Sequence, residues 1–456
     1  MSEGLVLVGL LPLLAGLATM AWIKRPRLAF HLALGVSFAT IALALAAAGV
    51  PRGEVVRDSL LPAWIGVDGL SGPLLPFEAV LLTALVAGEP RATGTPRVLG
   101  ALLVSGGATL LMLESLSLPL LVSLWALSFA PALALSRDCA ARPLVLVGAV
   151  SALALEGAGV VSAWLPPLER SGFMFVVSPG WPARLTFGLV LLAALLRCGA
   201  LPAQVWITSA LSRGSLGLAL HVIGGRAGVY VLLRLFGDMP AEADRASALL
   251  GALGLATALY GAVLGLAQTE TRRVVASLAI AHGGMILVGL SSGSAQARIG
   301  VLLLWWSLGV AWTGLALVGV ALEARCGRAQ VDTVRGIGRS LPGLGAFYLV
   351  CGACCVGFPG SLGFVAEELL THGLFAEAPL QGAGVLLVMA LNGMVVVRSY
   401  LWVFMGPLPG ELPGPPATRP RERLVFMAAG AVLFGFGLRP ALLIEIASEA
   451  VRAAGG

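Results

Sequence analysis

The chain has 456 residues, of which 58% are hydrophobic and 11% are charged, and its mean hydropathy is +0.95. Soluble globular proteins carry roughly 25% charged residues, so this composition excludes an ordinary soluble domain and indicates an integral membrane protein. The formal net charge is +6, but only Lys24 is a lysine and the arginines are scattered through short polar segments, which argues against a nucleic-acid-binding surface.

Apolar stretches of about 20 residues recur along the whole chain, and each is long enough to span a bilayer as a helix. They do not alternate polar and apolar residues as barrel strands do. We therefore expect an all-α polytopic membrane protein with about fourteen transmembrane helices. In chain order these are expected near 4–23, 28–49, 62–87, 97–113, 117–136, 143–163, 185–203, 215–236, 246–268, 274–292, 299–321, 341–370, 380–406 and 424–444.

Two of the expected helices contain residues that interrupt a helix. The stretch "VGFPGSLGFVAEELL" (356–370) combines glycines and a proline with two adjacent carboxylates, and "HVIGGRAGVY" (221–230) is rich in glycine. Irregular backbone at membrane depth is tolerated where it lines a cavity, and ion-coupled transporters often contain such broken helices. We expect breaks at 221–230 and at 357–363.

The arginine distribution predicts the orientation. The odd-numbered loops hold 17 basic residues and the even-numbered loops hold six. The odd loops are therefore expected in the cytoplasm, and both termini on the outer, periplasmic side of a bacterial inner membrane. The first apolar stretch has no basic region before it and is interpreted as a retained span.

The six cysteines indicate neither a disulfide framework nor a metal site. Cys351, Cys354 and Cys355 lie together in an apolar segment with no second ligand cluster, so small packing residues are the better interpretation. No glycine-rich phosphate-binding loop is present, and we expect no cofactor.

Ionisable side chains inside spans are costly in hydrocarbon and usually mark ion pathways. A set of acids, bases and histidines at intervals along the chain suits a hydrated proton pathway; its members are Glu156, Arg197, His221, Arg226, His282 and Glu367. For Glu156 an interfacial position is the alternative, and for His282 a packing role. Residues near span ends are less clear, with interfacial anchoring favoured for the two arginines: Arg234, Arg398, Asp68, Glu78 and Glu114.

Four motifs in order resemble the antiporter-like membrane subunits of respiratory complex I, membrane-bound hydrogenases and Mrp-type cation/proton antiporters. They are "RCGALPAQVWITSALSRGSLGLALHVIGGRAGVYVLLRLF" (197–236), "QTETRRVVASLAIAHGGMILVGL" (268–290), the stretch 356–370 and "ALNGMVVVRSYLWVFMG" (390–406). The resemblance runs from about residue 60 to the C-terminus. It implies two inverted five-helix repeats, each with a broken helix, around a hydrated axis. The implied domains are N-terminal helices (1–96), a first repeat (97–236), a second repeat (246–406) broken near 357–363, and a loop with a C-terminal helix (407–456).

The resemblance also assigns residues. Arg197 and Arg226 take the places of two family lysines, His282 matches a family histidine, and Glu367 takes the terminal lysine-or-glutamate position. The family glutamate that partners the first lysine is replaced by Ala126. Two family histidines are also replaced, one by Gln204 and one by a tryptophan within 302–312. Because a buried lysine can lose its proton whereas an arginine effectively cannot, a relay through these arginines would not itself cycle. Glu156 is a candidate replacement partner for Arg197.

The leading hypothesis is a proton-translocating subunit of an inner-membrane complex, with other membrane subunits as partners, protons as cargo and a Na⁺ role left open. It would be at most a non-redox subunit of an NADH:quinone oxidoreductase-like translocase. The alternative is a degenerate membrane anchor that recruits a large soluble partner, for example in inorganic-carbon uptake. Loss of the glutamate at Ala126 favours the alternative, whereas Glu156, His282 and Glu367 favour retained conduction.

Overall fold

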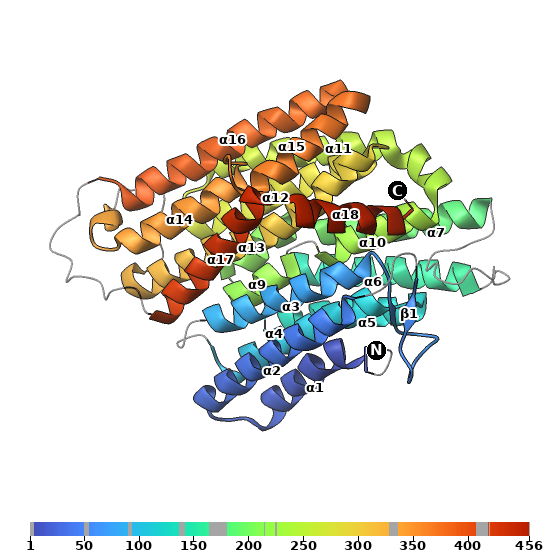
Figure 1. The fold of residues 1–456 in the computed structure, drawn as a ribbon, viewed down its shortest axis with the longest axis horizontal. Helices are drawn as coiled ribbons and strands as arrows, with labels where there is room; N and C mark the ends of the chain where they lie inside the picture. Colours follow the sequence, from blue (N-terminus) through green and yellow to red (C-terminus); the bar gives the residue numbers. More distant parts are fainter. Residues whose placement is uncertain are drawn as a thin grey trace. The chain divides into compact units, whose positions relative to one another are not determined.

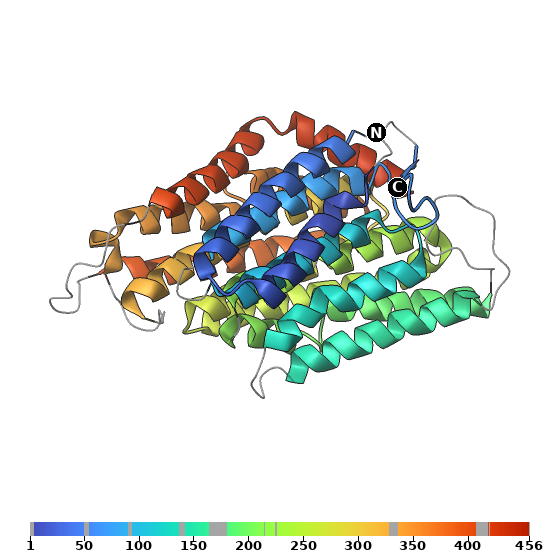
Figure 2. The ribbon, with the colours of Figure 1, turned by 90° about the horizontal axis from the view of Figure 1, so that it is seen from below.

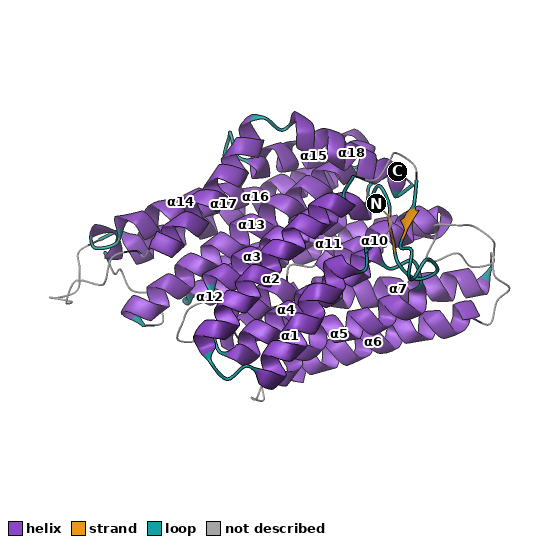
Figure 3. Ribbon diagram, turned by 60° about the horizontal axis from the view of Figure 1, so that its bottom comes forward, coloured by secondary structure: helices purple, strands orange, loops and turns teal. Residues whose placement is uncertain are grey.

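The computed structural model describes residues 4–49, 54–89, 94–135, 142–163, 180–213, 215–223, 226–327, 336–406, 418 and 420–455. Most of these residues are helical, and the strands among them form one short hairpin (Figures 1 and 3). The chain divides into two compact units. Unit 1 contains Met1–Ala248 and Ile446–Gly456, and unit 2 contains Leu249–Glu445.

Unit 1 is built from ten helices within its described residues, together with the hairpin and parts of α11 and α18. The helices are α1 (Leu7–Trp22), α2 (Pro26–Ala47), α3 (Ser71–Gly88), α4 (Pro96–Glu114), α5 (Leu118–Leu135), α6 (Arg142–Ala163), α7 (Trp181–Cys198), α8 (Val205–Arg213), α9 (Leu216–Ile223) and α10 (Arg226–Asp238). The hairpin strands are β1 (Val56–Arg57) and β2 (Gly66–Val67), which pair antiparallel.

Unit 2 contains a second set of helices, and its chain begins within α11 (Pro240–Ala267) and ends within α18 (Ala441–Ala453). Between these lie α12 (Thr271–Ser291), α13 (Ala295–Cys326), the short 3₁₀ helix η2 (Ile337–Arg339), α14 (Pro342–Cys355), α15 (Leu362–Glu377), α16 (Pro379–Phe404) and α17 (Pro420–Leu438).

The described helices have the length and composition of membrane spans. Ten segments, one of which (Leu216–Asp238) includes both α9 and α10, are long and apolar enough to cross a bilayer. The number is eleven if α17 and α18, which meet at 82°, form one broken span. Three shorter apolar helices, Leu7–Trp22, Leu118–Ala132 and Pro342–Cys355, accompany them. The predicted all-α polytopic membrane fold is therefore confirmed, whereas the number fourteen and the inverted repeats remain predictions.

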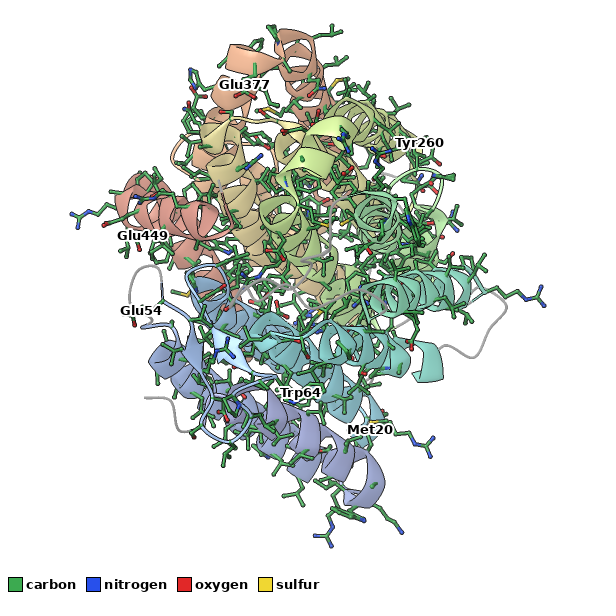
Figure 4. The ribbon with its side chains drawn as sticks, turned by 90° about the vertical axis from the view of Figure 1, so that its right-hand side faces the viewer. Met20, Glu54, Trp64, Tyr260, Glu377 and Glu449 are labelled. Atoms are coloured by element: carbon green, nitrogen blue, oxygen red, sulfur yellow. The ribbon has the colours of Figure 1, made fainter. Side chains whose placement is uncertain are left out.

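The predicted third span begins too early. Residues 62–70 do not open a helix, because the chain forms the β1–β2 hairpin there and α3 starts only at Ser71. Asp58 stabilises this loop by accepting backbone N–H bonds from Val6 at 3.1 Å and Leu60 at 2.8 Å. Figure 4 shows Glu54 and Trp64 on this loop. An apolar stretch therefore does not distinguish a hairpin from the first turns of a helix.

Helices α1 and α4 pack closely through glycines. A Cβ on Gly107 would lie 2.6 Å from the carbonyl oxygen of Gly9, and a Cβ on Gly16 would lie 2.6 Å from that of Gly100. Small residues let membrane helices approach until their backbones touch, which gains dispersion energy where no hydrophobic effect acts. The four glycines therefore set the distance between α1 and α4.

We expect Gly107→Ala to destabilise unit 1 by about 1–3 kcal/mol, because the added methyl must push two backbones apart. The matched control is Gly35→Ala on α2, whose new Cβ would meet nothing within 4 Å. Thermal unfolding in detergent measures the difference. Equal melting temperatures for the two variants would contradict the proposed close packing.

Helices α5, α6 and α7 run side by side within unit 1 (Figure 2). Trp125 on α5 donates its indole N–H to Ser151 on α6 at 3.1 Å, and Phe129 lies against Gly148. These contacts hold the inner face of α5 in place, and this face carries the residues that surround Arg197 on α7.

Candidate functional site

Unit 2 contains a broken helix over the residues where the sequence places the second break. Helix α14 ends at Cys355 and α15 begins at Leu362. Gly357 and Gly360 have φ values of 61° and 88°, a left-handed conformation that ends helices and is favourable for glycine. Ser361 then starts α15 as an N-cap residue, since its hydroxyl accepts the Phe364 N–H at 3.2 Å.

Glu367 lies on α15 beside this break. Its residue exposure is 1%, and its Oε2 atom has no hydrogen-bond partner among the described residues. A Cβ at Gly357 would overlap Oε2, so the carboxyl group lies directly against the interrupted backbone. An ionised carboxylate without a partner is very costly in such a place, so Glu367 is suited to bind a proton or water.

Its neighbour Glu368 has a different environment. The Glu368 side chain is 50% exposed and lies 3.3 Å from Nδ1 of His372, which is also exposed. Two consecutive residues of α15 therefore have opposite environments: the Glu367 carboxyl group is buried inside unit 2, and that of Glu368 lies on its surface. At the end of the same helix, Glu377 accepts a hydrogen bond from Ser292 at 3.0 Å, which fixes α15 to the residues that follow α12.

His282 on α12 is fully buried and contacts the broken helix. Its Nε2 lies 2.7 Å from the carbonyl oxygen of Cys355, the last residue of α14, and its Nδ1 lies 2.7 Å from that of Leu278. A neutral imidazole has one N–H, so only the protonated ring can donate to both carbonyls. The Trp312 ring packs against His282 with the centroids 5.8 Å apart. His282 is therefore positioned to link a proton to the geometry of the break.

Unit 1 contains a second break, between α7 and α8. Helix α7 ends at Cys198, Gly199 has a φ of 68°, and α8 begins at Val205. Trp206 on α8 donates its indole N–H to the Leu196 carbonyl at 2.9 Å, which satisfies one of the carbonyls at the end of α7. The expected first break, 221–230, includes residues 224–225 between α9 and α10, which lie outside the described residues. The break at Gly199 was not expected, although Gly199 and Pro202 mark it much as Gly357 and Pro359 mark the other.

Arg197 occupies the last turn of α7 and is 2% exposed. It donates to the Ser128 hydroxyl at 2.8 Å, and its guanidinium carbon lies 3.9 Å from the Phe129 ring centroid and 4.9 Å from that of Trp125. The C-terminal end of a helix and aromatic faces both stabilise a cation. No carboxylate of the described residues forms an ion pair with Arg197, so it is a fixed positive charge held by dipoles and rings.

Glu78 on α3 and His221 on α9 form a buried acid–base pair in unit 1. Glu78 Oε1 lies 3.3 Å from His221 Nδ1, and both side chains are at most 2% exposed. The other ring nitrogen of His221 lies 3.4 Å from the hydroxyl of Thr109 on α4. An acidic and a basic side chain are therefore in contact between helices α3, α4 and α9.

Asp68, just before α3, forms an ion pair with Arg234 on α10, with a second contact at 2.8 Å. Arg234 also donates to the Tyr230 hydroxyl at 3.1 Å, and Tyr230 donates to the Leu113 carbonyl at 2.9 Å. Burial alone would raise the pKa of Asp68, but the Arg234 cation and hydrogen bonds from Arg234 and Ser71 outweigh it and lower this pKa. The cluster joins α3, α4 and α10. Arg234 is therefore a buried structural residue, and its interfacial position remains a prediction.

The comparisons with known proteins decide the family. The family model described as "NADH:quinone oxidoreductase/Mrp antiporter, TM" matches residues 145–392, more than half of the chain. The chain belongs to this family. It is therefore an antiporter-like membrane subunit, as the resemblance implied.

Relatives in the family cover most of the chain. NAD(P)H-quinone oxidoreductase chain 4 1 of a Nostoc species is 27% identical over 449 residues, covering 90% of this chain and 83% of the relative. A chain of respiratory complex I from Thermus thermophilus superimposes with a TM-score of 0.84 at 22% identity and covers 99% of this chain and 100% of that one. A chain of the Mrp complex from a Dietzia species gives 0.85 at 17% identity, with 99% of each chain covered. At these identities the structural matches show the fold.

The structure separates some of the residues that the sequence was expected to bring together. Glu156 is exposed on α6 and forms no ion pair with Arg197, so the expected pairing of these two residues is wrong. Ala126, which replaces the family glutamate, is exposed on α5, whereas Trp125 and Phe129 on the same helix contact Arg197. Arg226 begins α10, and its side chain lies outside the described part of the chain. The pathway roles of the six candidate residues remain predictions.

Two carboxylates that the sequence left unclear, Glu78 and Glu114, are buried in the structure. Glu78 is 2% exposed and paired with His221. Glu114, the last residue of α4, is fully buried, and neither of its carboxyl oxygens has a partner among the described residues. Both look like carboxylates near span ends in the sequence. Their burial depends on which helices pack against them, and the local sequence does not specify this packing.

The left-handed glycines of the second break allow a matched test. We expect Gly360→Ala to cost about 1–2 kcal/mol, the penalty of a left-handed residue with a side chain. Gly357→Ala should cost about 1–3 kcal/mol more, because its methyl group would displace the Glu367 carboxyl. Thermal unfolding in detergent distinguishes the two variants. If both lose the same stability, Glu367 does not lie against Gly357.

Proposed function

We propose that the chain translocates protons as an antiporter-like subunit of an inner-membrane complex. The observation that carries this proposal is Glu367, a buried carboxyl group with an unpartnered oxygen at a helix break in a membrane unit. A group in this position can take up and release a proton with little side-chain movement. His282 supports the proposal, because the Cys355 carbonyl connects it to the same break.

The two breaks also support the division into repeats, which we retain as part of the proposal. The break after α7 falls in the expected first repeat, 97–236, and the break after α14 falls in the expected second repeat, 246–406. Arg197 precedes the first break and Glu367 follows the second. Arg197 lies in the last turn of α7, where the helix dipole stabilises a cation.

The printed names of the relatives indicate the partners. Proteins named as NAD(P)H-quinone oxidoreductase chains and chains of respiratory complex I and the Mrp complex act within multi-subunit assemblies. We infer that this chain associates with other membrane subunits of a respiratory or antiporter-like complex, in which electron transfer belongs to the partners. Na⁺ is retained as an alternative transported ion.

A degenerate anchor is the second candidate, and one observation favours it. Arg197 stands where the resemblance places a lysine, and no carboxylate of the described residues is paired with it. An arginine does not release its proton, so this site cannot cycle as a lysine would. A chain of this kind would hold a soluble partner at the membrane without passing protons.

Proton uptake by liposomes separates the two candidates. The full-length chain, purified with the membrane subunits that accompany it, is reconstituted in potassium-loaded liposomes. Valinomycin then sets an interior-negative potential, and a trapped dye reports the internal pH. The proposal predicts acidification well above that of empty liposomes. Acidification equal to that of empty liposomes would overturn proton translocation and leave the anchor.

A further inference from the structure

Proton transfer through unit 1 requires a group that can exchange protons, and Arg197 is not that group. Its guanidinium is permanently charged, and it is held by Ser128 and two aromatic rings. The surface position of Glu156 removes the expected carboxylate partner as well. If unit 1 takes part in proton transfer, the exchanging group lies elsewhere among its buried residues.

The Glu78–His221 pair has the required chemistry. Histidine changes its charge near neutral pH, and a carboxyl group accepts a proton in the same range when its surroundings favour the neutral form. Glu78 Oε1 and His221 Nδ1 are 3.3 Å apart, within hydrogen-bonding distance. A proton that moves from Oε1 to Nδ1 breaks one O–H bond and forms one N–H bond, and the net charge of the pair does not change.

The second nitrogen of His221 fixes the orientation of the imidazole. Nε2 lies 3.4 Å from the Thr109 hydroxyl, which donates to the Ser105 carbonyl at 2.9 Å. The Ser105 hydroxyl donates to the Ser128 carbonyl at 2.7 Å, and the Ser128 hydroxyl accepts from Arg197. Polar groups thus follow one another across α4 and α5 from His221 to Arg197. Carbonyls interrupt the hydroxyls, so this chain of contacts fixes the positions of its members and does not itself carry a proton to Arg197.

One more carboxylate lies against the same short helix. Glu89 at the end of α3 is buried, and its Oε2 atom would lie 2.8 Å from a Cβ at Gly217 in the first turn of α9. A negative charge at a helix N-terminus is stabilised by the helix dipole. Glu89 therefore lies at the N-terminus of α9, whereas Glu78 faces the His221 imidazole inside the unit.

We infer that Glu78 and His221 together form a proton-binding site of unit 1, with Glu78 as its carboxyl group and Thr109 positioning the imidazole. This inference rests on the proposed function. It names an acid that neither the motifs nor the comparisons identify. It also explains how unit 1 can keep an exchangeable proton although Ala126 replaces the family glutamate.

The test compares variants in the liposome assay. Glu78→Gln and His221→Gln should each lower the initial rate of acidification at least about 100-fold, the lower end of general acid–base effects. Glu78→Asp keeps a carboxyl group and should retain a rate within about threefold of wild type. The matched control is Glu54→Gln, which neutralises an exposed carboxylate in the same unit. Size-exclusion profiles and melting temperatures verify folding, and His221→Gln carries the test if Glu78→Gln does not fold.

The outcomes of this inference and of the proposed function differ. If wild type acidifies the liposomes and folded Glu78→Gln or His221→Gln does so at the wild-type rate, the proton-binding site in unit 1 is overturned. If wild type itself does not acidify them, the proposed function fails first, and the inference fails with it. A loss in both Gln variants with recovery in Glu78→Asp would establish a requirement for the carboxyl group.

Discussion

Glu367→Gln is expected to reduce potential-driven proton uptake to the level of empty liposomes while the protein stays folded. The amide has nearly the shape of the acid and keeps the contact with Gly357, but it cannot bind and release a proton. Removing a general acid–base group typically lowers a rate by about 10²–10⁴-fold, which is below detection in this assay. Because the carboxyl group is buried without a full set of partners, its neutralisation should not destabilise unit 2.

The adjacent residue supplies the control. Glu368→Gln removes a charge of the same type one position along α15, but this side chain is half exposed and pairs with His372. We expect its uptake to stay within about twofold of wild type, since exposed ion pairs contribute at most about 1 kcal/mol. Equal losses of uptake in both variants would show that uptake depends on the total charge of α15 and not specifically on the buried Glu367 carboxyl group.

The largest effect on stability is expected from Arg234→Met. This change leaves the Asp68 carboxylate buried without its ion-pair partner and also removes the hydrogen bond to Tyr230. Breaking a buried pair by removing one member costs about 3–5 kcal/mol. Arg245→Met is the matched control, because Arg245 pairs with Glu242 on the surface, where such a contact is worth at most about 1 kcal/mol. Denaturation in increasing SDS measures both, and similar losses would contradict a structural role for the Asp68–Arg234 pair.

The same pair predicts a pH dependence with a defined sign. The pKa of Asp68 is lower in the folded protein than its usual value. A depressed folded pKa stabilises the protein above the unfolded pKa of about 3.9, and this contribution is lost as the pH falls through the folded pKa. Asp68→Asn should therefore be less stable than wild type at neutral pH, and the difference should shrink in acid. A difference that is constant with pH would assign the loss to packing.

Much of the site in unit 2 could be predicted from the sequence because its elements are local. Gly357, Pro359 and Glu367 lie within a short stretch, and left-handed glycines followed by a capping serine have a direct structural meaning. His282 is distant in sequence, and both its position inside an expected span and the motif resemblance pointed to it. Its contact with the Cys355 carbonyl depends on how α12 and α14 pack, which no local pattern contains.

Unit 1 was harder to predict because its polar contacts join helices that are far apart in sequence. Nothing near Glu78 indicates His221, and nothing near Asp68 indicates Arg234. The expected pairing of Glu156 with Arg197 followed from their neighbouring spans, but a helix presents its side chains in all directions. Rotation of α6 places Glu156 on the surface, and the position of a residue along a span does not specify that rotation.

Covalent modification of Glu367 tests the central claim most directly. Dicyclohexylcarbodiimide, an apolar reagent, reacts with protonated carboxyl groups within membranes, and peptide mass spectrometry gives the modified fraction at each glutamate. Liposomes containing wild-type protein are sampled over time for both modification and proton uptake. We predict that Glu367 is modified and that uptake falls in proportion to its unmodified fraction. Wild-type uptake by protein fully modified at Glu367 would contradict the account.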